Sequence, residues 1–326
     1  MLYEVAGRRL LIDAADVWSS LAVSNLFAGW FLTPLPANGS GPPHATMRIR
    51  CGAIPPALPE GLSSFEIVYG GACHTDGETL YLNLDGSLTI IGPGSEPEVE
   101  VWIRRHYDFS SKILAQIISL AFSAVLRRCG RFELHSAGVL PPDRNQAILI
   151  TGASGSGKST ITLQLASCGW RYLSDDTLLL YEREQGLEVR GLRRFFALTA
   201  RTIEATSLPG MPAMTNTGFS KERMEPEQFF PAGHVQSARP GVMFFPIITH
   251  EADSRLKKLT AGETMSRLLK LSPWAAYDRP TAPGHLSMLG RLAGETVAFD
   301  ILAGQDLLGD PRRVADLLSD CMRGTG

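Results

Sequence analysis

The chain has 326 residues, 44% of them hydrophobic, which is enough for one large domain or two ordinary ones with a buried core. We expect two domains. Its 31 Lys and Arg against 33 Asp and Glu leave a net charge of −2. This balance excludes the nucleic-acid-binding class, because such binding needs a clustered basic surface.

The cysteines and the N-terminal residues indicate the cellular compartment. Five cysteines are scattered along the chain without a C-x-x-C spacing, which favours reduced thiols over a metal site or a redox pair. Glu4 and two arginines precede the first apolar run, so the basic-then-apolar order of a secretory signal is missing. We therefore expect a cytoplasmic protein.

The first hundred residues predict short strands and turns. Proline- and glycine-rich clusters at 34–43 and 53–61 alternate with short apolar runs such as FEIVYG and TLYLNL. The two most apolar stretches, 17–35 and 113–126, offer no 20 uninterrupted apolar residues, so we expect buried helices and no membrane association. The segment from Glu98 to Trp102 alternates acidic and apolar residues, as a strand does.

A helix follows from Ser110, where the apolar period becomes helical. Asp108 and Ser110 are its candidate N-terminal caps, Arg127 and Arg128 suit its C-terminal dipole, and Gly130 stops it. We place a domain boundary near residue 105. The predicted organisation is a mainly β domain over 1–105 and a larger domain over 106–326.

The second domain begins with the order strand, turn, strand, loop, helix, strand. The strands are predicted at 132–140, 147–151 and 171–181, and the helix at 159–168 is stopped by Gly169. Further along, 187–199 is predicted as paired strands, 207–241 is rich in Pro, Gly and Met, 242–249 is a buried strand and 310–322 a terminal helix. The fold class is α/β, a mixed sheet around the helix that follows the glycine-rich loop.

That loop carries the strongest functional signal. GASGSGKST satisfies the P-loop pattern G-x-x-x-x-G-K-[ST], and it follows an apolar strand and opens a helix, as the motif requires. Its glycines let backbone N–H groups wrap a phosphate at a helix N-terminus, while Lys158 supplies charge to the β and γ phosphates and the Ser159 hydroxyl binds magnesium. The predicted cofactors are ATP and Mg²⁺. The predicted nucleotide-binding residues are Gly152, Ala153, Ser154, Gly155, Ser156, Gly157, Lys158, Ser159 and Thr160.

Phosphoryl transfer also needs a carboxylate for the metal and a base for the acceptor hydroxyl. Asp175 and Asp176 are the candidates, because they follow the P-loop helix on the next strand, which returns beside the phosphates. The sequence does not separate their two roles. A solvated acidic turn is the alternative, which the apolar flanks disfavour.

Four segments together resemble the catalytic domain of the HPr kinase/phosphorylase family: LHSAGVL, ILITGASGSGKST, CGWRYLSDD and LEVRG. The resemblance covers roughly residues 131–191. It implies that His135 lies beside the aspartates and poises the base, that Asp175 and Asp176 share metal and base roles, and that Glu188 is a second magnesium ligand. With Lys158, these residues form the predicted catalytic set.

Two departures separate the chain from that family. LEVRG continues as LRRFFALTAR instead of a glycine- and isoleucine-rich strand, so phosphorylase activity is not expected. Residues 1–105 do not resemble the regulatory domain of the bifunctional enzymes. The chain is similar instead to divergent relatives that phosphorylate precursor peptides, in lasso peptide systems at a C-terminal serine. The segment 218–233 resembles a Lys-Arg loop of these relatives, which implies that Lys221 and Arg223 contact phosphate or an acidic acceptor. A solvated charged loop is the alternative that stays open.

The predicted function is ATP-dependent, magnesium-assisted phosphorylation of a serine hydroxyl in a protein, HPr among the candidates, or in a precursor peptide. Two other classes stay open: a small-molecule hydroxyl kinase, because the same site serves any hydroxyl that reaches the γ phosphate in line, and a non-catalytic nucleotide-binding regulator. The resemblance also favours a homo-oligomer.

Overall fold

The chain forms a mixed α/β structure that divides into two compact units. The structure, a computed structural model, describes residues 1–36, 41–67, 70–93, 97–206 and 221–323. Unit 1 comprises Met1–Phe132 with Trp274–Leu286, and unit 2 comprises Glu133–Pro273 with Ser287–Gly326. The boundary expected near residue 105 lies inside unit 1, where the helix expected to open the second domain packs against the first sheet.

Unit 1 is built on one sheet with the strand order β3-β1-β2-β4-β9-β8-β7-β6-β5. Its strands are β1 (Leu2–Val5), β2 (Arg8–Ala14), β3 (Thr33–Leu35), β4 (Ala45–Cys51), β5 (Ser63–Ile67), β6 (Gly71–Thr75), β7 (Leu80–Leu84), β8 (Ser87–Ile91) and β9 (Glu98–Ile103). Strands β2 and β4 run parallel, and helix α1 (Val17–Phe27) and strand β3 lie between them in the chain. Strands β5 to β9 form an antiparallel meander. The strand-and-turn character expected for this region is confirmed.

Helix α2 (Lys112–Arg128) confirms the helix expected from residue 110, with a different cap. Ser111 is the N-cap, and its hydroxyl accepts from the Leu114 N–H at 3.4 Å. Asp108 instead accepts from the Ser110 N–H at 2.7 Å, in the turn before the helix. The predicted N-cap was therefore wrong by one residue. Asp108 and Ser110, the two expected caps, are hydrogen-bonded to each other in the preceding turn.

Unit 1 also contains a buried cluster of charged residues that are far apart in the sequence. Asp278, just beyond α7 (Trp274–Tyr277), lies 2.8 Å from Arg127 Nε and 2.8 Å from Arg128 Nη1. The three side chains are at most 2% exposed. Burial alone would raise the pKa of Asp278, but the two guanidinium groups hold it below its usual range. The segment 274–286 thus supplies the counter-ion for two buried arginines of α2.

Unit 2 is built on a second mixed sheet in which a ring of strands closes. Its strands are β10 (Phe132–Leu140), β11 (Gln146–Thr151), β12 (Arg171–Ser174), β13 (Thr177–Arg183), β14 (Gly186–Gly191), β17 (Ser237–Ile248), β18 (Arg255–Leu259) and β19 (Val297–Ala303). The order is β11-β10-β13-β14-β17-β19-β18, and β17 also pairs with β11. A separate two-stranded sheet joins β15 (Phe196–Leu198) to β16 (Glu222–Met224).

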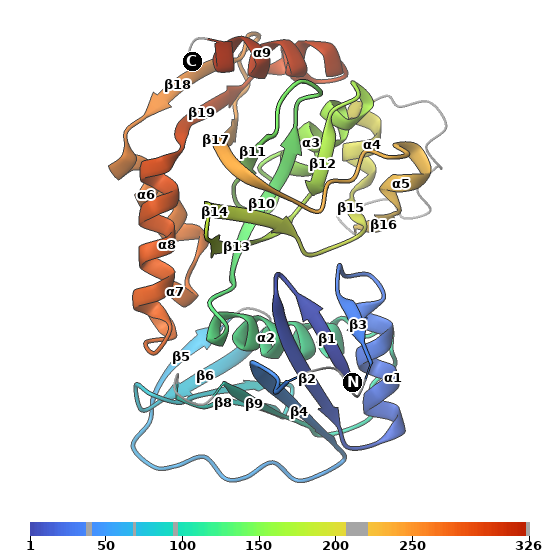
Figure 1. Cartoon of the computed structure of the whole chain (residues 1–326), viewed down its shortest axis with the longest axis vertical. Coiled ribbons are helices and arrows are strands. Elements are labelled where there is room, and N and C mark those ends of the chain that lie inside the picture. Colours follow the sequence, from blue (N-terminus) through green and yellow to red (C-terminus); the bar gives the residue numbers. More distant parts are fainter. Residues whose placement is uncertain (37–40, 68–69, 94–96, 207–220, 324–326) are drawn as a thin grey trace. The chain divides into compact units, whose positions relative to one another are not determined.

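Helices cover the core of unit 2 (Figure 1). They are α3 (Lys158–Ser167), α4 (Ala200–Thr206), α5 (Pro226–Phe229), α6 (Ala261–Leu271), α8 (Ala282–Glu295), which begins within unit 1, the short 3₁₀ helix η2 (Gln305–Leu307) and α9 (Pro311–Arg323). Helix α3 packs against α9 and α4, and its apolar residues Leu163 and Leu165 are fully buried in a cluster with Phe244 and Leu318. The terminal helix and the buried strand after residue 242 are confirmed.

Two predictions for unit 2 were wrong. The strand expected over 171–181 is two strands, β12 and β13, which both pair with β10 and are separated at the two aspartates. The strands expected to pair within 187–199 do not pair with each other, because β14 pairs with β13 and β17 while β15 pairs with β16. Of the Pro- and Gly-rich stretch 207–241, residues 207–220 lie outside the described residues.

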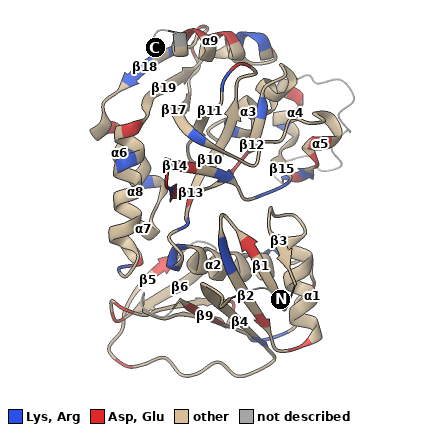
Figure 2. Ribbon diagram, in the orientation of Figure 1, with Lys and Arg blue, Asp and Glu red and all other residues tan. Residues whose placement is uncertain are grey.

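Charge is mixed over the elements of both units. Figure 2 shows Lys and Arg interspersed with Asp and Glu in each unit, and α9 carries both signs. Among the helices that the structure describes, none combines the length and the apolar character needed to cross a bilayer.

Candidate active site

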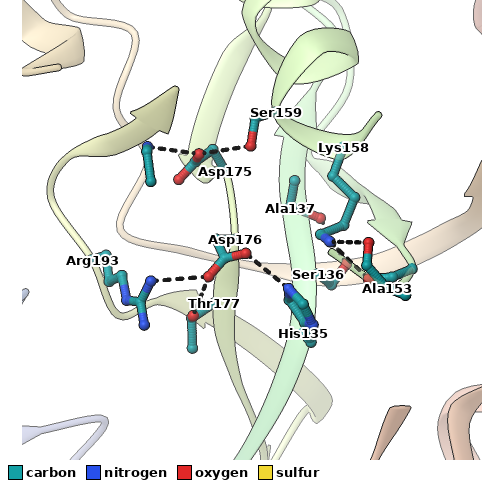
Figure 3. A network of polar contacts seen from close by, with 12 residues as sticks. His135, Ser136, Ala137, Ala153, Lys158, Ser159, Asp175, Asp176, Thr177 and Arg193 are labelled. Atoms are coloured by element: carbon teal, nitrogen blue, oxygen red, sulfur yellow. Dashed lines mark hydrogen bonds and ion pairs between the residues drawn. The ribbon is translucent and has the colours of Figure 1, made fainter. Parts of the chain in front are cut away.

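The central strand β10 brings the predicted site residues together. On one side it pairs with β11, Ser136 opposite Thr151, and on the other with β12, Gly138 opposite Ser174. The glycine-rich loop starts directly after Thr151, and the aspartates start directly after Ser174. His135 therefore lies between the loop and the aspartate pair, as Figure 3 shows.

The glycine-rich loop has the backbone freedom that its sequence predicts. Gly155 and Gly157 adopt φ of 84° and 99°, a region that disfavours other residues, and Gly157 is the N-cap of α3. At Gly152 a Cβ would lie 2.6 Å from Ser156 Oγ, so a side chain there would require the Ser156 side chain to move. Ala153, Ser154 and Gly155 are exposed. The loop apex and the N-terminal N–H groups of α3 thus suit an anion.

Lys158, the first residue of α3, turns back over this loop. Its ammonium donates to the carbonyl oxygens of Gly152 at 2.7 Å and Ala153 at 3.0 Å. These contacts use two of its three N–H groups. Burial lowers the pKa of Lys158 to about 8, although the nearby Asp176 and Asp175 act in the opposite direction. The side chain therefore carries most of its charge at neutral pH, directly beside the loop.

Ser159 connects the helix to the first aspartate. Its hydroxyl donates to Asp175 Oδ2 at 3.0 Å, and the backbone N–H of Ala197 donates to the same oxygen at 3.0 Å. Asp175 is fully buried, and its Oδ1 has no hydrogen-bond partner among the described residues. Burial, followed by the neighbouring charge of Asp176, raises the pKa of Asp175 to about 6.

Asp176 has the opposite electrostatic environment. Its Oδ1 lies 2.9 Å from His135 Nε2, and its Oδ2 accepts from Arg193 Nη1 at 3.0 Å and from the Thr177 hydroxyl at 3.2 Å. Burial alone would raise the pKa of Asp176, but the His135 hydrogen bond and the Arg193 charge outweigh it and hold that pKa well below its usual range. Because an ionised carboxylate only accepts, Nε2 of His135 carries the proton of this bond.

The segment 192–197 contributes two contacts that the sequence analysis missed. Arg193 pairs with Asp176, and the Ala197 backbone pairs with Asp175. The β13–β14 hairpin returns the chain to this place, where the Leu192 N–H donates to the Thr177 carbonyl at 3.1 Å. No spacing rule ties residue 193 to residue 176. The two arginines that follow LEVRG were the only sequence feature that could have indicated this contact. In the sequence they only mark a departure from the family pattern.

Glu188 is not brought to the aspartates. It pairs across the hairpin with Tyr181, while Leu178, at the other end of β13, pairs with Gly191. Three residues of strand therefore separate Glu188 from that end, about 10 Å at 3.3 Å per residue. Its carboxylate forms an ion pair with Arg183 at 2.8 Å, in a surface groove of about 690 Å³ along the hairpin. A magnesium-binding role for Glu188 stays a prediction without a contact that supports it.

The remaining predicted residues lie in α3 and in or next to β16. Thr160 Oγ1 contacts Thr202 Oγ1 at 3.5 Å, which ties α3 to α4. Lys221 is exposed, and its positive charge contributes to lowering the pKa values of Lys158 and Asp176. The Arg223 guanidinium stacks 4.4 Å from the Phe195 ring centroid.

The aspartate and serine oxygens fit a magnesium ion. Mg²⁺ prefers hard oxygen ligands and usually takes one or two carboxylates, with substrate phosphates and water completing the coordination. Asp175 offers a buried oxygen, Oδ1, that has no hydrogen-bond partner in the described part of the chain, and its other oxygen accepts from the Ser159 hydroxyl. Among the described residues no group of three or more His, Cys, Asp or Glu side chains is placed to hold a metal without such help.

Comparisons with known proteins find only a distant structural similarity. No family model matches it, and no curated protein does. Among solved structures 98 chains match, and one of them is the HPr(Ser) kinase/phosphatase from Coxiella burnetii. It is 12% identical, covers 60% of this chain and 99% of its own, and has a TM-score of 0.30. Membership in the HPr kinase family and the link to precursor peptide kinases stay predictions.

Proposed function

We propose that the protein is an ATP-dependent, magnesium-assisted kinase that phosphorylates a serine hydroxyl of a protein or peptide. One observation carries the proposal: two successive aspartates beside the glycine-rich loop have separate partners, Ser159 for Asp175 and His135 for Asp176. A site with one carboxylate on the metal side and another on the acceptor side has the two groups that phosphoryl transfer to a hydroxyl needs.

The residues divide as follows. Lys158 and the N–H groups of the loop and α3 bind the β and γ phosphates. Ser159 and Asp175 would hold a magnesium ion, which would supply positive charge to neutralise the phosphates. Asp176 accepts the proton of the acceptor hydroxyl as its oxygen bonds to the γ phosphorus, the bond from that phosphorus to the bridging oxygen breaks, and ADP leaves. His135 orients Asp176 through its Nε2–H.

This division gives the two aspartates different phenotypes. Asp175→Asn should raise the magnesium concentration needed for half-maximal rate, because the metal loses an anionic ligand. Asp176→Asn should lower kcat by about 100-fold or more, a common loss when a general base is removed. Asp143→Asn, at an exposed turn residue, is the matched control. Equal phenotypes for Asp175→Asn and Asp176→Asn would contradict the division.

The acceptor class rests on the sequence resemblance to protein serine kinases. The chain carries their histidine, aspartate pair and Glu-x-Arg-Gly segment together, and a lasso peptide precursor with a C-terminal serine is the finer candidate. Lys221 and Arg223, on the β16 side of the site, are available for an acidic acceptor. A small-molecule hydroxyl kinase is the competing outcome.

The test is incubation with γ-labelled ATP and Mg²⁺ and three acceptor groups: HPr, precursor peptides with a C-terminal serine, and small alcohols such as glycerol and free serine. Mass spectrometry identifies the phosphorylated product. Lys158→Ala is the inactive reference, and Lys270→Ala, at an exposed lysine of α6, is its matched control. Label found only on a small alcohol would overturn the polypeptide acceptor, and nucleotide binding without any transfer would overturn the kinase function.

A further inference from the structure

We propose that Arg193 is a positioning residue for the transfer reaction, holding the Asp176 carboxylate in one orientation so that Oδ1 faces the acceptor hydroxyl beside His135. This inference rests on the proposed function. Arg193 belongs to the stretch where the chain departs from the HPr kinase pattern, so the family resemblance assigns it no role.

The contacts on Asp176 define that orientation. His135 holds Oδ1, whereas Arg193 and Thr177 hold Oδ2. A carboxylate held at one oxygen alone turns easily, because the terminal torsion of Asp is broad. Contacts on both oxygens fix its plane. Each oxygen has two acceptor positions, so Arg193 and Thr177 fill those of Oδ2 and leave one on Oδ1 for the acceptor hydroxyl.

Arg193 is itself held in place from both sides. Before it, the Leu192 N–H donates to the Thr177 carbonyl at 3.1 Å. After it, Phe196 packs edge-on against Tyr172 at 5.1 Å, and the Ala197 N–H donates to Asp175 at 3.0 Å. The segment is thus attached to β12, to the start of β13 and to both aspartates. A side chain on a backbone held in this way can fix the geometry of another.

The partial exposure of the Arg193–Asp176 ion pair distinguishes a role in positioning from a role in folding stability. The Arg193 side chain is 32% exposed, against 2% for Arg127 in its ion pair with Asp278. Solvent weakens a partly exposed pair, and such pairs contribute about 1 kcal/mol or less to folding. A displacement of about 1 Å in a reacting group, by contrast, costs about 100-fold in rate. Removing Arg193 should therefore change catalysis far more than stability.

The test compares Arg193→Ala and Arg193→Lys with Arg201→Ala, whose arginine is exposed on the nearby α4. The reaction uses Mg·ATP and the acceptor that the wild-type protein phosphorylates. For Arg193→Ala we expect kcat to fall by about 30- to 100-fold, with KM for ATP within about twofold. The unfolding temperature should fall by no more than about 4 °C, because the pair contributes about 1 kcal/mol or less. Because the contact uses a single N–H, Arg193→Lys should recover kcat to within about fivefold, and Arg201→Ala should match the wild type.

Other results contradict the inference in distinguishable ways. If Arg193→Ala keeps kcat within about twofold, the residue has no positioning role. If its loss of kcat is matched by losses of nucleotide affinity and unfolding temperature, its role is structural. A wild-type protein that binds Mg·ATP and transfers phosphate to no acceptor overturns the kinase function itself, and the role of Arg193 with it.

Discussion

Replacing each adjacent aspartate by asparagine should change stability in opposite directions. Asp175 has a raised pKa, so its contribution to stability is complete below pH of about 4 and is lost as the pH rises through about 6. Asp176 has a lowered pKa, so its contribution is present at neutral pH and is lost on acidification. At pH 7.5 we therefore expect Asp175→Asn to be more stable than the wild type and Asp176→Asn to be less stable.

The magnitude for Asp175 follows from its environment. Burial raises its pKa from 3.8 to about 6, and at about 1.4 kcal/mol per pKa unit the buried charge costs about 3 kcal/mol at neutral pH. An asparagine oxygen can keep the bonds from Ser159 and Ala197, but its NH₂ then replaces Oδ1, which has no described partner. This unsatisfied NH₂ donor destabilises the Asp175→Asn protein by about 1 to 2 kcal/mol. The expected net gain is about 1 to 2 kcal/mol.

Scanning calorimetry at pH 7.5 and pH 5 tests this difference. A gain of that size raises the unfolding temperature by about 2 to 6 °C in a domain of this size, and it should shrink at pH 5, where wild-type Asp175 is largely protonated. Asp176→Asn, which loses the ionic part of its contacts with His135 and Arg193, should lower the unfolding temperature. An Asp175→Asn protein that unfolds below the wild type at pH 7.5 would refute the reasoning.

Three further predictions concern nucleotide binding. Lys158→Ala should abolish it in calorimetric titrations with Mg·ATP, and affinity within about twofold of the wild type would reject the P-loop assignment. In the wild type, the affinity for Mg·ATP should fall by up to about tenfold per pH unit as the pH rises through about 8, because Lys158 loses its proton there. An affinity that stays constant up to pH 9.5 would contradict this. Gly152→Ala should weaken binding by up to about tenfold, since its Cβ would lie 2.6 Å from Ser156 Oγ and 3.2 Å from Ser156 Cβ and would force the Ser156 side chain to move within the loop. Unchanged binding would show that this movement leaves the phosphate site intact.

The sequence predicted what local patterns determine, and it failed where strands remote in the chain meet. The glycine-rich loop, the helix that follows it and the aspartate pair carry short-range signals, and β10 brings them together as expected. The separation of the aspartate roles required the partners of each carboxylate. Arg193 and Ala197 reach the site through the β13–β14 hairpin, which no periodicity describes. Glu188 was predicted by resemblance alone, and the hairpin register places it elsewhere.

Unit 1 cannot be completed in the order in which its residues are synthesised. Its two buried arginines, Arg127 and Arg128, pair with Asp278. The two parts of unit 1 are separated by residues 133–273 of unit 2, which are 141 residues. At bacterial to eukaryotic elongation rates this interval lasts on the order of 10 to 30 s. In a nascent chain ending near residue 132, burying the two guanidinium groups as in the complete unit would leave them without their counter-ion and would cost several kcal/mol. The buried ion pairs of unit 1 can therefore form only after residues 133–273 of unit 2 have been made.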